Sequence, residues 1–321
     1  MKKSTGHHSL EKENLHPRNR HRTPYDFDQL IAACKELKSC VYINEHGVRS
    51  IDFSDPGAVK ILNKALLKRF YDVSDWNIPE GYLCPAIPGR ADYIHYAADL
   101  LSSCNNGVLP EGGKIKVLDV GTGASCVYPL IGVKEYNWNF IGSDTDQVAV
   151  ASAQRIIQSN PALAGKIELR LQDDPNAIFK NVLKPGEVID MSVCNPPFHP
   201  SAEAAAAGSE RKVRNLGDSS SGKPILNFGG QNNELWFKGG EASFIYYMIM
   251  ESAQLKEKCL WFTSLVSRKE SLAGIYKTLE KVEAAEVRTI NTSQGQKKSR
   301  IVAWSFLGAD QQKRWCKERW K

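Results

Sequence analysis

The sequence predicts an α/β fold in which helices cover both faces of a mostly parallel, seven-stranded sheet. The first observation is that apolar, strand-like runs alternate with amphipathic helical runs from Lys114 onward. The second is the short connection "SQGQKKSR" between the last two strand-like runs. A parallel crossover needs about a dozen residues or more, so these two strands are expected to form a terminal antiparallel hairpin.

Each element of the predicted sheet domain, 111–310, follows from a local pattern. The strand-like runs are short, rich in β-branched and aromatic residues, and bounded by turn residues. Runs with helical spacing separate them, as in "QVAVASAQRII" and "RKESLAGIYKTLEKV". The expected strands are 114–121, 139–144, 167–172, 188–195, 259–266, 286–292 and 301–307.

Residues 25–110 predict a small α+β appendage before the sheet. Apolar residues recur at helical spacing over 27–37 and 59–70, and "ADYIHYAADLL" (91–101) is a third amphipathic helix. Between the first two helices, "VYINEHGVRSIDF" (41–53) has the pattern of a hairpin that turns at His46-Gly47.

The net charge of +6 is concentrated at the two ends of the chain. Residues 1–24 carry six Lys or Arg against two Glu, and 311–321 carry five against one, so each end has +4 and the rest has −2. We therefore predict a flexible basic tail at 1–24 that contacts phosphates, and a basic C-terminal tail at 311–321. Trp315 and Trp320 of the second tail either stack on bases or pack a helix onto the domain.

The composition also limits the class of protein. No apolar run approaches the ~18 residues of a membrane span, and the N-terminus has no apolar signal core, so a cytoplasmic protein is expected. The eight cysteines include no Cys-x-x-Cys pair, so we expect reduced thiols and no metal site.

Residues 201–240 are rich in Gly, Ser, Ala and Asn without a clear period, which predicts a mobile substrate loop.

The string "LDVGTGASC" (118–126) predicts a glycine turn that binds a nucleoside ligand. Asp144 ends the next strand, where an acid can accept the ribose hydroxyls. A dinucleotide site would have a third glycine where Cys126 stands. Asp119 beside the turn suits a ligand with a cationic amino-acid end, which favours S-adenosylmethionine over a dinucleotide. At the third strand end, Gln172 and Asp173 are candidates for hydrogen bonds to adenine, or for a simple helix cap.

The string "SVCNPPFHP" (192–200) places stiff residues at the end of the fourth strand. Prolines stop a strand because they lack an N–H and have a fixed φ. Asn195 and Phe198 are therefore held at the carboxyl edge of the sheet, where open α/β sheets bind ligands.

The order of glycine turn, acid and Asn-Pro-Pro-Phe resembles the class I S-adenosylmethionine-dependent methyltransferases, which have a Rossmann-like seven-stranded sheet. Longer strings make the resemblance more specific: "LHPRNRH", "RADYIHYAADLL", "LDVGTGASCVYPLIG", "CNPPFH", "GGE" and "VAWSF" are similar to the bacterial large-subunit (23S) ribosomal RNA adenine-N6 methyltransferases. That family is related to the eukaryotic enzymes that modify adenine in U6 small nuclear RNA. The resemblance implies that the cofactor is contacted by Arg90, Gly121, Ser125, Asp144 and Asn195.

The Asn-Pro-Pro-Phe turn suits an exocyclic adenine amine, which is a poor nucleophile because its lone pair is delocalised into the ring. The Asn195 side-chain oxygen and the Pro196 carbonyl can accept both N–H bonds and stabilise the charge that develops on nitrogen. Pro197 stiffens the turn, and Phe198 offers a face on which the base stacks.

The resemblance implies 23S ribosomal RNA, or an assembly intermediate of the large subunit, as the partner. The residues predicted to bind RNA are Arg18, Arg20, Arg22, Lys297 and Lys298. Three alternatives stay open at this point: a ribosomal RNA guanine-N2 methyltransferase, a glutamine-N5 protein methyltransferase, and an RNA-binding module without catalysis.

Overall fold

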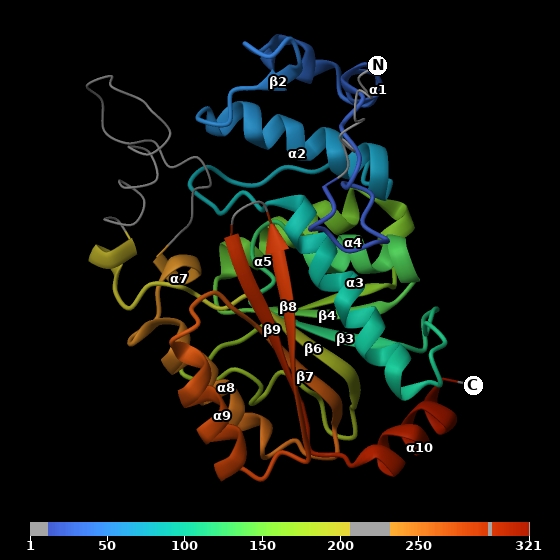
Figure 1. Ribbon diagram of the computed structural model, residues 1–321, viewed down its shortest axis with the longest axis vertical. Helices are drawn as coiled ribbons and strands as arrows, with labels where there is room; N and C mark the ends of the chain where they lie inside the picture. Colours follow the sequence, from blue (N-terminus) through green and yellow to red (C-terminus); the bar gives the residue numbers. More distant parts are fainter. Residues whose placement is uncertain (1–11, 206–231, 295–296, 321) are drawn as a thin grey trace, which may run out of the picture.

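The computed structural model describes residues 12–205, 232–294 and 297–320. Its centre is a seven-stranded sheet in the order β5-β4-β3-β6-β7-β9-β8 (Figure 1). The strands are β3 Lys116–Val120, β4 Asn139–Asp144, β5 Ile167–Leu171, β6 Ile189–Cys194, β7 Cys259–Val266, β8 Glu286–Gln294 and β9 Lys297–Ser305. All seven predicted strands are present, and the predicted α/β fold class is confirmed.

The topology determines where a ligand can bind. The chain enters the sheet at β3, moves outward through β4 and β5, and returns to place β6 beside β3 in parallel. This reversal between β3 and β6 opens a crevice at the carboxyl ends of the strands. At the other edge, β8 and β9 pair antiparallel with each other, as the short connection predicted. Strand β9 also pairs antiparallel with β7.

Two apolar layers enclose the sheet. Alternate residues of one strand point to opposite faces: Ile301 and Ala303 join one cluster, and Val302 and Trp304 join the other. The first layer contains α2 Pro56–Tyr71, α3 Ile87–Cys104, α4 Val127–Tyr136 and α5 Gln147–Gln158. The second contains α8 Gly240–Ser252 and α9 Ser271–Lys281.

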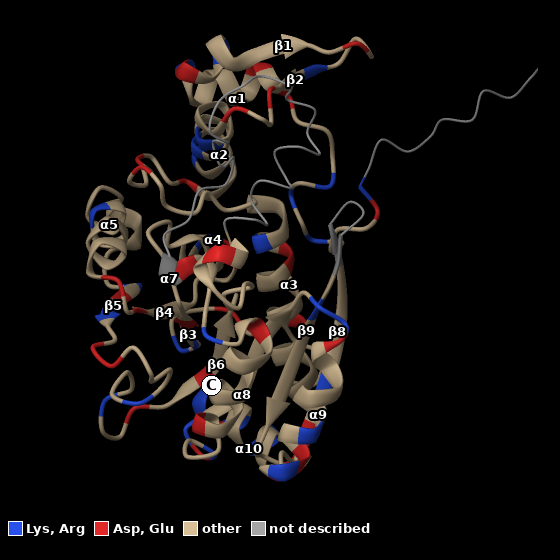
Figure 2. Ribbon diagram, turned by 90° about the vertical axis from the view of Figure 1, so that its left-hand side faces the viewer, with Lys and Arg blue, Asp and Glu red and all other residues tan. Residues whose placement is uncertain are grey.

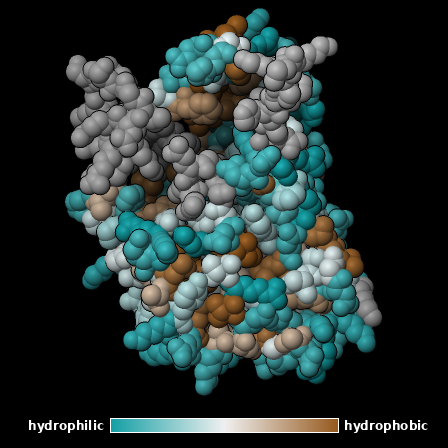
Figure 3. All heavy atoms as spheres, in the orientation of Figure 1, coloured by the Kyte–Doolittle hydropathy of each residue, from teal (hydrophilic) through white to brown (hydrophobic). Residues whose placement is uncertain are grey.

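The predicted N-terminal appendage has the expected elements but is only partly separate. It contains α1 Phe27–Ala33, the 3₁₀ helix η1 Lys35–Cys40, and the hairpin of β1 Val41–Ile43 and β2 Arg49–Ile51. Large hydrophobic side chains are exposed on and beside this hairpin: Tyr42, Ile43, Val48 and Phe53. The hairpin lies at the top of the molecule in Figure 1, where Figure 3 shows hydrophobic atoms among hydrophilic ones. In contrast, α3 shares the core of the sheet domain, where the Tyr93 hydroxyl contacts Thr263 Oγ1 at 2.9 Å.

The prediction of a flexible tail over 1–24 is wrong for residues 12–24, which fold onto α3. His16, Asn19 and His21 are at most 4% exposed. Asp92 is buried on α3, and a buried carboxylate requires hydrogen-bond donors. The His16 N–H and the Asn19 side-chain amide supply them.

The predicted C-terminal tail is also folded. Residues Ala309–Arg319 form α10. The indole N–H groups of Trp315 and Trp320 donate to Oδ1 of the fully buried Asp190, at 2.7 and 2.8 Å. The two tryptophans therefore pack the helix onto the domain.

The predicted mobile loop, 201–240, is only partly described. Residues 206–231 lie outside the described part of the chain. Residues 232–240 are described, beginning with α7 Asn232–Leu235, and the backbone of Leu235 and Phe237 is hydrogen-bonded to His199, which follows the Asn-Pro-Pro-Phe turn. None of the helices described between residues 12 and 320 has both the length and the apolar character needed to cross a membrane.

Candidate active site

The glycine turn after β3 forms one wall of a cavity of about 510 Å³. Gly121 and Gly123 have φ of +70° and +64°, a region that L side chains rarely adopt. The N–H groups of Gly121 and Thr122 both donate to the Ser143 carbonyl, which ties the turn to β4. The glycines let the backbone form the cavity wall without side chains.

Asp144 lies at the end of β4 and lines the same cavity. Its Oδ2 accepts the Gly123 N–H at 2.8 Å and its Oδ1 accepts the Asp146 N–H at 3.0 Å. Burial raises the pKa of this carboxyl, while the two N–H donors oppose that shift. The acid predicted to bind ribose is therefore rigidly oriented at the cavity.

Asp119 is fully buried in β3 and has one oxygen without a partner. Its Oδ2 accepts a hydrogen bond from Thr122 Oγ1 at 2.8 Å, and its Oδ1 has no hydrogen-bond partner among the described residues. Burial raises its pKa to about 7, and the nearby Asp144 charge adds to that shift while Arg90 opposes it. A buried, unpaired carboxylate oxygen suits a cationic amine such as that of S-adenosylmethionine. Asp119 is not itself among the residues that line the cavity.

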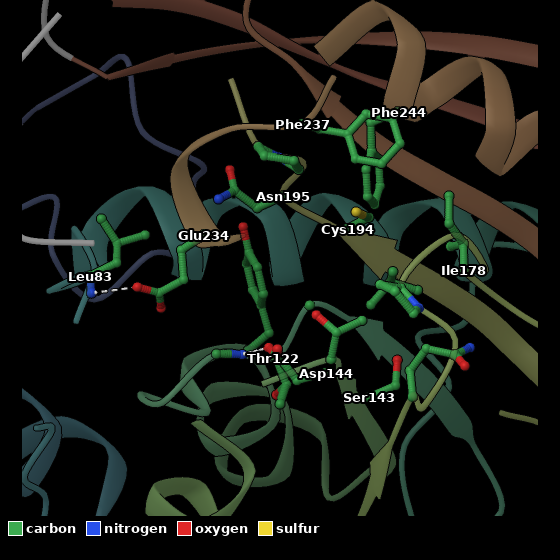
Figure 4. A pocket seen from close by; sticks show the side chains of 18 of the residues that line it. Leu83, Thr122, Ser143, Asp144, Ile178, Cys194, Asn195, Glu234, Phe237 and Phe244 are labelled. Atoms are coloured by element: carbon green, nitrogen blue, oxygen red, sulfur yellow. Dashed lines mark hydrogen bonds between the residues drawn. The ribbon is translucent and has the colours of Figure 1, made fainter. Parts of the chain in front are cut away.

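The Asn-Pro-Pro-Phe turn forms the opposite wall, at the end of β6. Asn195 and Pro197 line the cavity, and Pro196 is buried beneath the turn. Phe198 is half-buried and is not among the lining residues. Figure 4 shows Asn195 and Cys194 across the cavity from Thr122 and Asp144.

Arg90 reaches this wall from α3. Its Nη1 donates to Asn195 Oδ1 at 3.2 Å and to the Tyr128 hydroxyl at 3.1 Å, and its guanidinium lies over the Tyr128 ring. The structure therefore brings Arg90 next to Asn195, Gly121, Ser125 and Asp144 in one cavity.

The two candidates for adenine binding after β5, Gln172 and Asp173, have different positions relative to the cavity. Gln172 lines the cavity, but its amide donates to the Lys180 carbonyl at 2.7 Å and accepts the Asp174 N–H at 3.0 Å. Its side chain therefore holds the loop after β5. Asp173 is exposed and does not line the cavity. The same loop is anchored by Glu251 of α8, whose carboxylate accepts three consecutive backbone N–H groups, at 178–180.

Sequence reasoning missed the residues that close the cavity on its third side. They come from α7, α8 and the segment between them: Glu234, Trp236, Phe237, Lys238, Phe244 and Tyr247. The signal was present in "NNELWFKGGEASFIYY" (232–247), where aromatic residues follow the region without periodicity.

Of the residues predicted to bind RNA, the three arginines Arg18, Arg20 and Arg22 are not among those that line the cavity. Arg18 donates to Asp99 Oδ1, to the Tyr136 hydroxyl and to the His95 carbonyl, and Arg20 donates to Glu135. Arg22 is half-buried in the same folded segment. The side chains of Lys297 and Lys298 lie outside the described part of the structure, although their backbone begins β9. RNA binding by these five residues stays a prediction.

The described residues include no group of three or more His, Cys, Asp or Glu side chains arranged to hold a metal ion.

Comparison with solved structures shows the same architecture in human proteins. The catalytic domain of hMettl16 in complex with the MAT2A 3'UTR hairpin 1 matches with a TM-score of 0.76 and 28% identity, over 92% of this chain and 96% of that one. The N-terminal domain of human METTL16 in complex with SAH matches with a TM-score of 0.72 and 27% identity, over 91% and 99%.

Sequence comparison identifies bacterial relatives that share a higher identity with this chain than these two solved structures do. Residues 9–308 match the model of an RNA methyltransferase family. "Ribosomal RNA large subunit methyltransferase F" of Flavobacterium johnsoniae is 54% identical over 307 residues, which are 95% of this chain and 97% of the relative. The protein of the same name from Photobacterium profundum is 52% identical over 326 residues, 97% of this chain and 96% of the relative. The resemblance inferred from the sequence is thus confirmed, and the chain belongs to this RNA methyltransferase family.

Proposed function

We propose that this protein transfers a methyl group from S-adenosylmethionine to the exocyclic N6 amine of an adenine in large-subunit (23S) ribosomal RNA. One observation carries the proposal: Asn195 and Pro197 line the same cavity as Gly121 and Asp144. A methyl donor at the glycine turn and a base at the Asn-Pro-Pro-Phe turn would be held against each other in that cavity, which removes much of the entropic barrier to reaction.

The cofactor would be held by residues that already face the cavity or lie beside it. Asp144 would accept the ribose hydroxyls, and the unpaired Oδ1 of Asp119 would accept from the amine. Arg90 has five N–H donors, of which the structure uses Nη1 toward Tyr128 and Asn195. Its other donors suit a carboxylate, while Gly121 and Ser125 form the backbone wall. S-adenosylmethionine supplies an electrophilic methyl group on sulfur.

The catalytic turn would act by hydrogen bonding and not by removing a proton in advance. Asn195 Oδ1 and the Pro196 carbonyl would accept the two amine hydrogens, so that the nitrogen lone pair turns toward the methyl group. Because Arg90 donates to Asn195 Oδ1, it orients the amide with the oxygen in place. Phe198 would stack on the base from the edge of the turn.

The substrate part of the proposal is supported by the relatives. The bacterial relatives are named for the large-subunit ribosomal RNA, and the hMettl16 domain was solved with an RNA hairpin. We therefore expect ribosomal RNA or a large-subunit assembly intermediate as substrate, and the bacterial cytoplasm as the site of action.

Methyl transfer to protein-free large-subunit ribosomal RNA tests the proposal. We expect label from S-adenosylmethionine in one adenine, identified as N6-methyladenosine by mass spectrometry of nuclease fragments. Label on a guanine N2 amine, or on protein only, would refute the proposed reaction. Intact large-subunit particles and purified RNA should be compared to identify the preferred substrate.

A further inference from the structure

An aromatic strip leads from the active-site cavity to the surface of α8. Phe237, Phe244 and Tyr247 line the cavity. The Phe237 ring lies edge-to-face against Phe244, with centroids 5.3 Å apart, and against Tyr247 at 6.0 Å. Tyr247 in turn lies edge-to-face against Tyr246 at 5.4 Å. The four rings form a continuous series.

The inner end of this strip is fixed to the catalytic turn. The His199 N–H donates to the Leu235 carbonyl and the Phe237 N–H donates to the His199 carbonyl, both at 3.0 Å. His199 directly follows the Asn-Pro-Pro-Phe turn. Figure 4 shows Phe237 and Phe244 at the end of the cavity near Asn195 and Cys194, away from Thr122 and Asp144. The strip therefore begins where the substrate base would lie.

The outer end of the strip is exposed to solvent. Tyr246 is 40% exposed and Tyr247 is 49% exposed. Within the part of the chain that the structure describes, neither hydroxyl makes a recorded hydrogen bond, whereas the equally exposed Tyr276 is bonded to Thr289. Two adjacent tyrosines that are exposed and do not belong to a hydrophobic core are typical of a surface that contacts a partner.

Positive charge lies at both ends of the strip. Lys238 lines the cavity beside Phe237 and is exposed. At the outer end, Tyr246 borders a surface hollow with Lys277, Lys281, Thr278 and Glu280 of α9. The two lysines outnumber the one glutamate there, and Figure 2 shows both blue and red segments at α9. Aromatic faces between cations are the combination that binds single-stranded nucleic acid.

We propose that Tyr247 and Tyr246 stack the bases of single-stranded RNA next to the target nucleotide, and that Lys277 and Lys281 contact its phosphates. The inference rests on the proposed function, because it assigns the RNA path to the active site described above. It accounts for aromatic residues that methyl transfer itself does not use. It also predicts recognition of an unpaired segment, because paired bases do not present their faces.

Binding of a fluorescently labelled oligoadenylate tests the strip directly. We expect Tyr246→Ala and Tyr247→Ala each to weaken binding by about 5- to 150-fold, and Tyr246→Phe and Tyr247→Phe to retain it, because the ring is kept. Tyr42→Ala is the matched control, because Tyr42 is also 49% exposed but lies on the β1–β2 hairpin. The same oligoadenylate annealed to oligouridylate should bind weakly and respond to none of the tyrosine changes.

Salt dependence separates the lysines from the tyrosines. Lys277→Gln with Lys281→Gln should lower the slope of log affinity against log salt by up to about 1.4, since each single-strand phosphate contact contributes ~0.7. The tyrosine variants should leave the slope unchanged. Lys313→Gln with Lys317→Gln is the control pair, with the same spacing and exposure on α10.

Wild-type affinity in both alanine variants, equal loss in Tyr42→Ala, or no binding of oligoadenylate by the wild type would overturn the inference. A protein that binds through Tyr246 and Tyr247 but methylates no adenine would instead overturn the proposed reaction and leave the strip intact. The two failures are therefore distinguishable.

Discussion

At the scale of single residues, the site contains two aspartates, Asp144 and Asp119, whose carboxylates differ in their hydrogen-bond partners. Asp144 accepts hydrogen bonds from two backbone N–H groups, whereas Asp119 has one partner and one oxygen that no described residue contacts by a hydrogen bond. The sequence indicated both acids, because Asp119 lies beside the glycine turn and Asp144 ends the next strand. It could not show that Asp173 is exposed, because exposure depends on how the loop after β5 turns.

Asp144→Ala tests the ribose assignment. Loss of hydrogen bonds to a buried ligand costs about 1–3 kcal/mol, so calorimetry should show S-adenosylmethionine affinity reduced by roughly 5- to 150-fold. Asp173→Ala is the control, since Asp173 is exposed and outside the cavity wall, and its affinity should equal that of the wild type. Equal losses in both variants would contradict the assignment.

The raised pKa of Asp119 predicts a pH effect on cofactor binding. Below its folded pKa of about 7 the carboxyl is neutral, and above it the carboxylate can pair with a cationic amine. Affinity for S-adenosylmethionine should therefore increase as the pH rises through 7, and Asp119→Asn should flatten the profile. A wild-type affinity that is independent of pH across this range would argue against the pairing.

At the scale of elements, the strands and the glycine turn were predictable and the chain ends were not. A strand in an alternating unit is determined by local apolar pattern, as in "KIKVLDVG". The segment 12–24 is polar and positively charged, which is also the pattern of a solvated tail. Its burial arises from distant partners, chiefly Asp92 and Asp99 of α3, which no local pattern reveals.

Buried histidines make the attachment of this segment sensitive to acid. His21 contacts the hydroxyls of Tyr25 and Tyr71, and His95 contacts that of Tyr136. Burial lowers the pKa of both histidines to about 3. The pKa of histidine in the unfolded chain is near 6.5, so between pH 6.5 and 3 the unfolded state binds more protons than the folded state. The stabilisation of the folded state that is present above pH 6.5 is therefore lost as the pH falls.

We therefore expect the free energy of unfolding in urea to decrease below pH 6.5, with a contribution to the slope of up to about 1.4 kcal/mol per pH unit from each histidine. His21→Phe should reduce that slope, because it removes one protonation site. A slope unchanged in this variant would show that His21 takes up no additional proton on unfolding and would contradict its lowered pKa.

At the scale of the whole molecule, the fold brings residues from across the chain to one cavity. Arg90 comes from α3, Asp144 from the end of β4, Asn195 from the turn after β6 and Phe237 from the segment before α8. The sheet order explains Asp144 and Asn195, because β3 lies between β4 and β6 and the carboxyl ends of these parallel strands meet at one edge of the sheet. The aromatic wall could not be predicted from that topology, since hydrogen bonds between His199 and residues 235–237 hold it in place.

The most direct test of the account is whether Asn195 acts in chemistry and not in binding. Asn195→Ala should lower the rate of methyl transfer to large-subunit ribosomal RNA by at least about 10²-fold, the usual loss when one preorganised hydrogen-bonding group is removed. Affinity for RNA should change little, because the residues predicted to contact its phosphates are untouched. Asn176→Ala, which removes an exposed asparagine that lines the same cavity, should keep its activity. Full activity in Asn195→Ala, or a loss of RNA affinity equal to the loss of activity, would contradict the central claim.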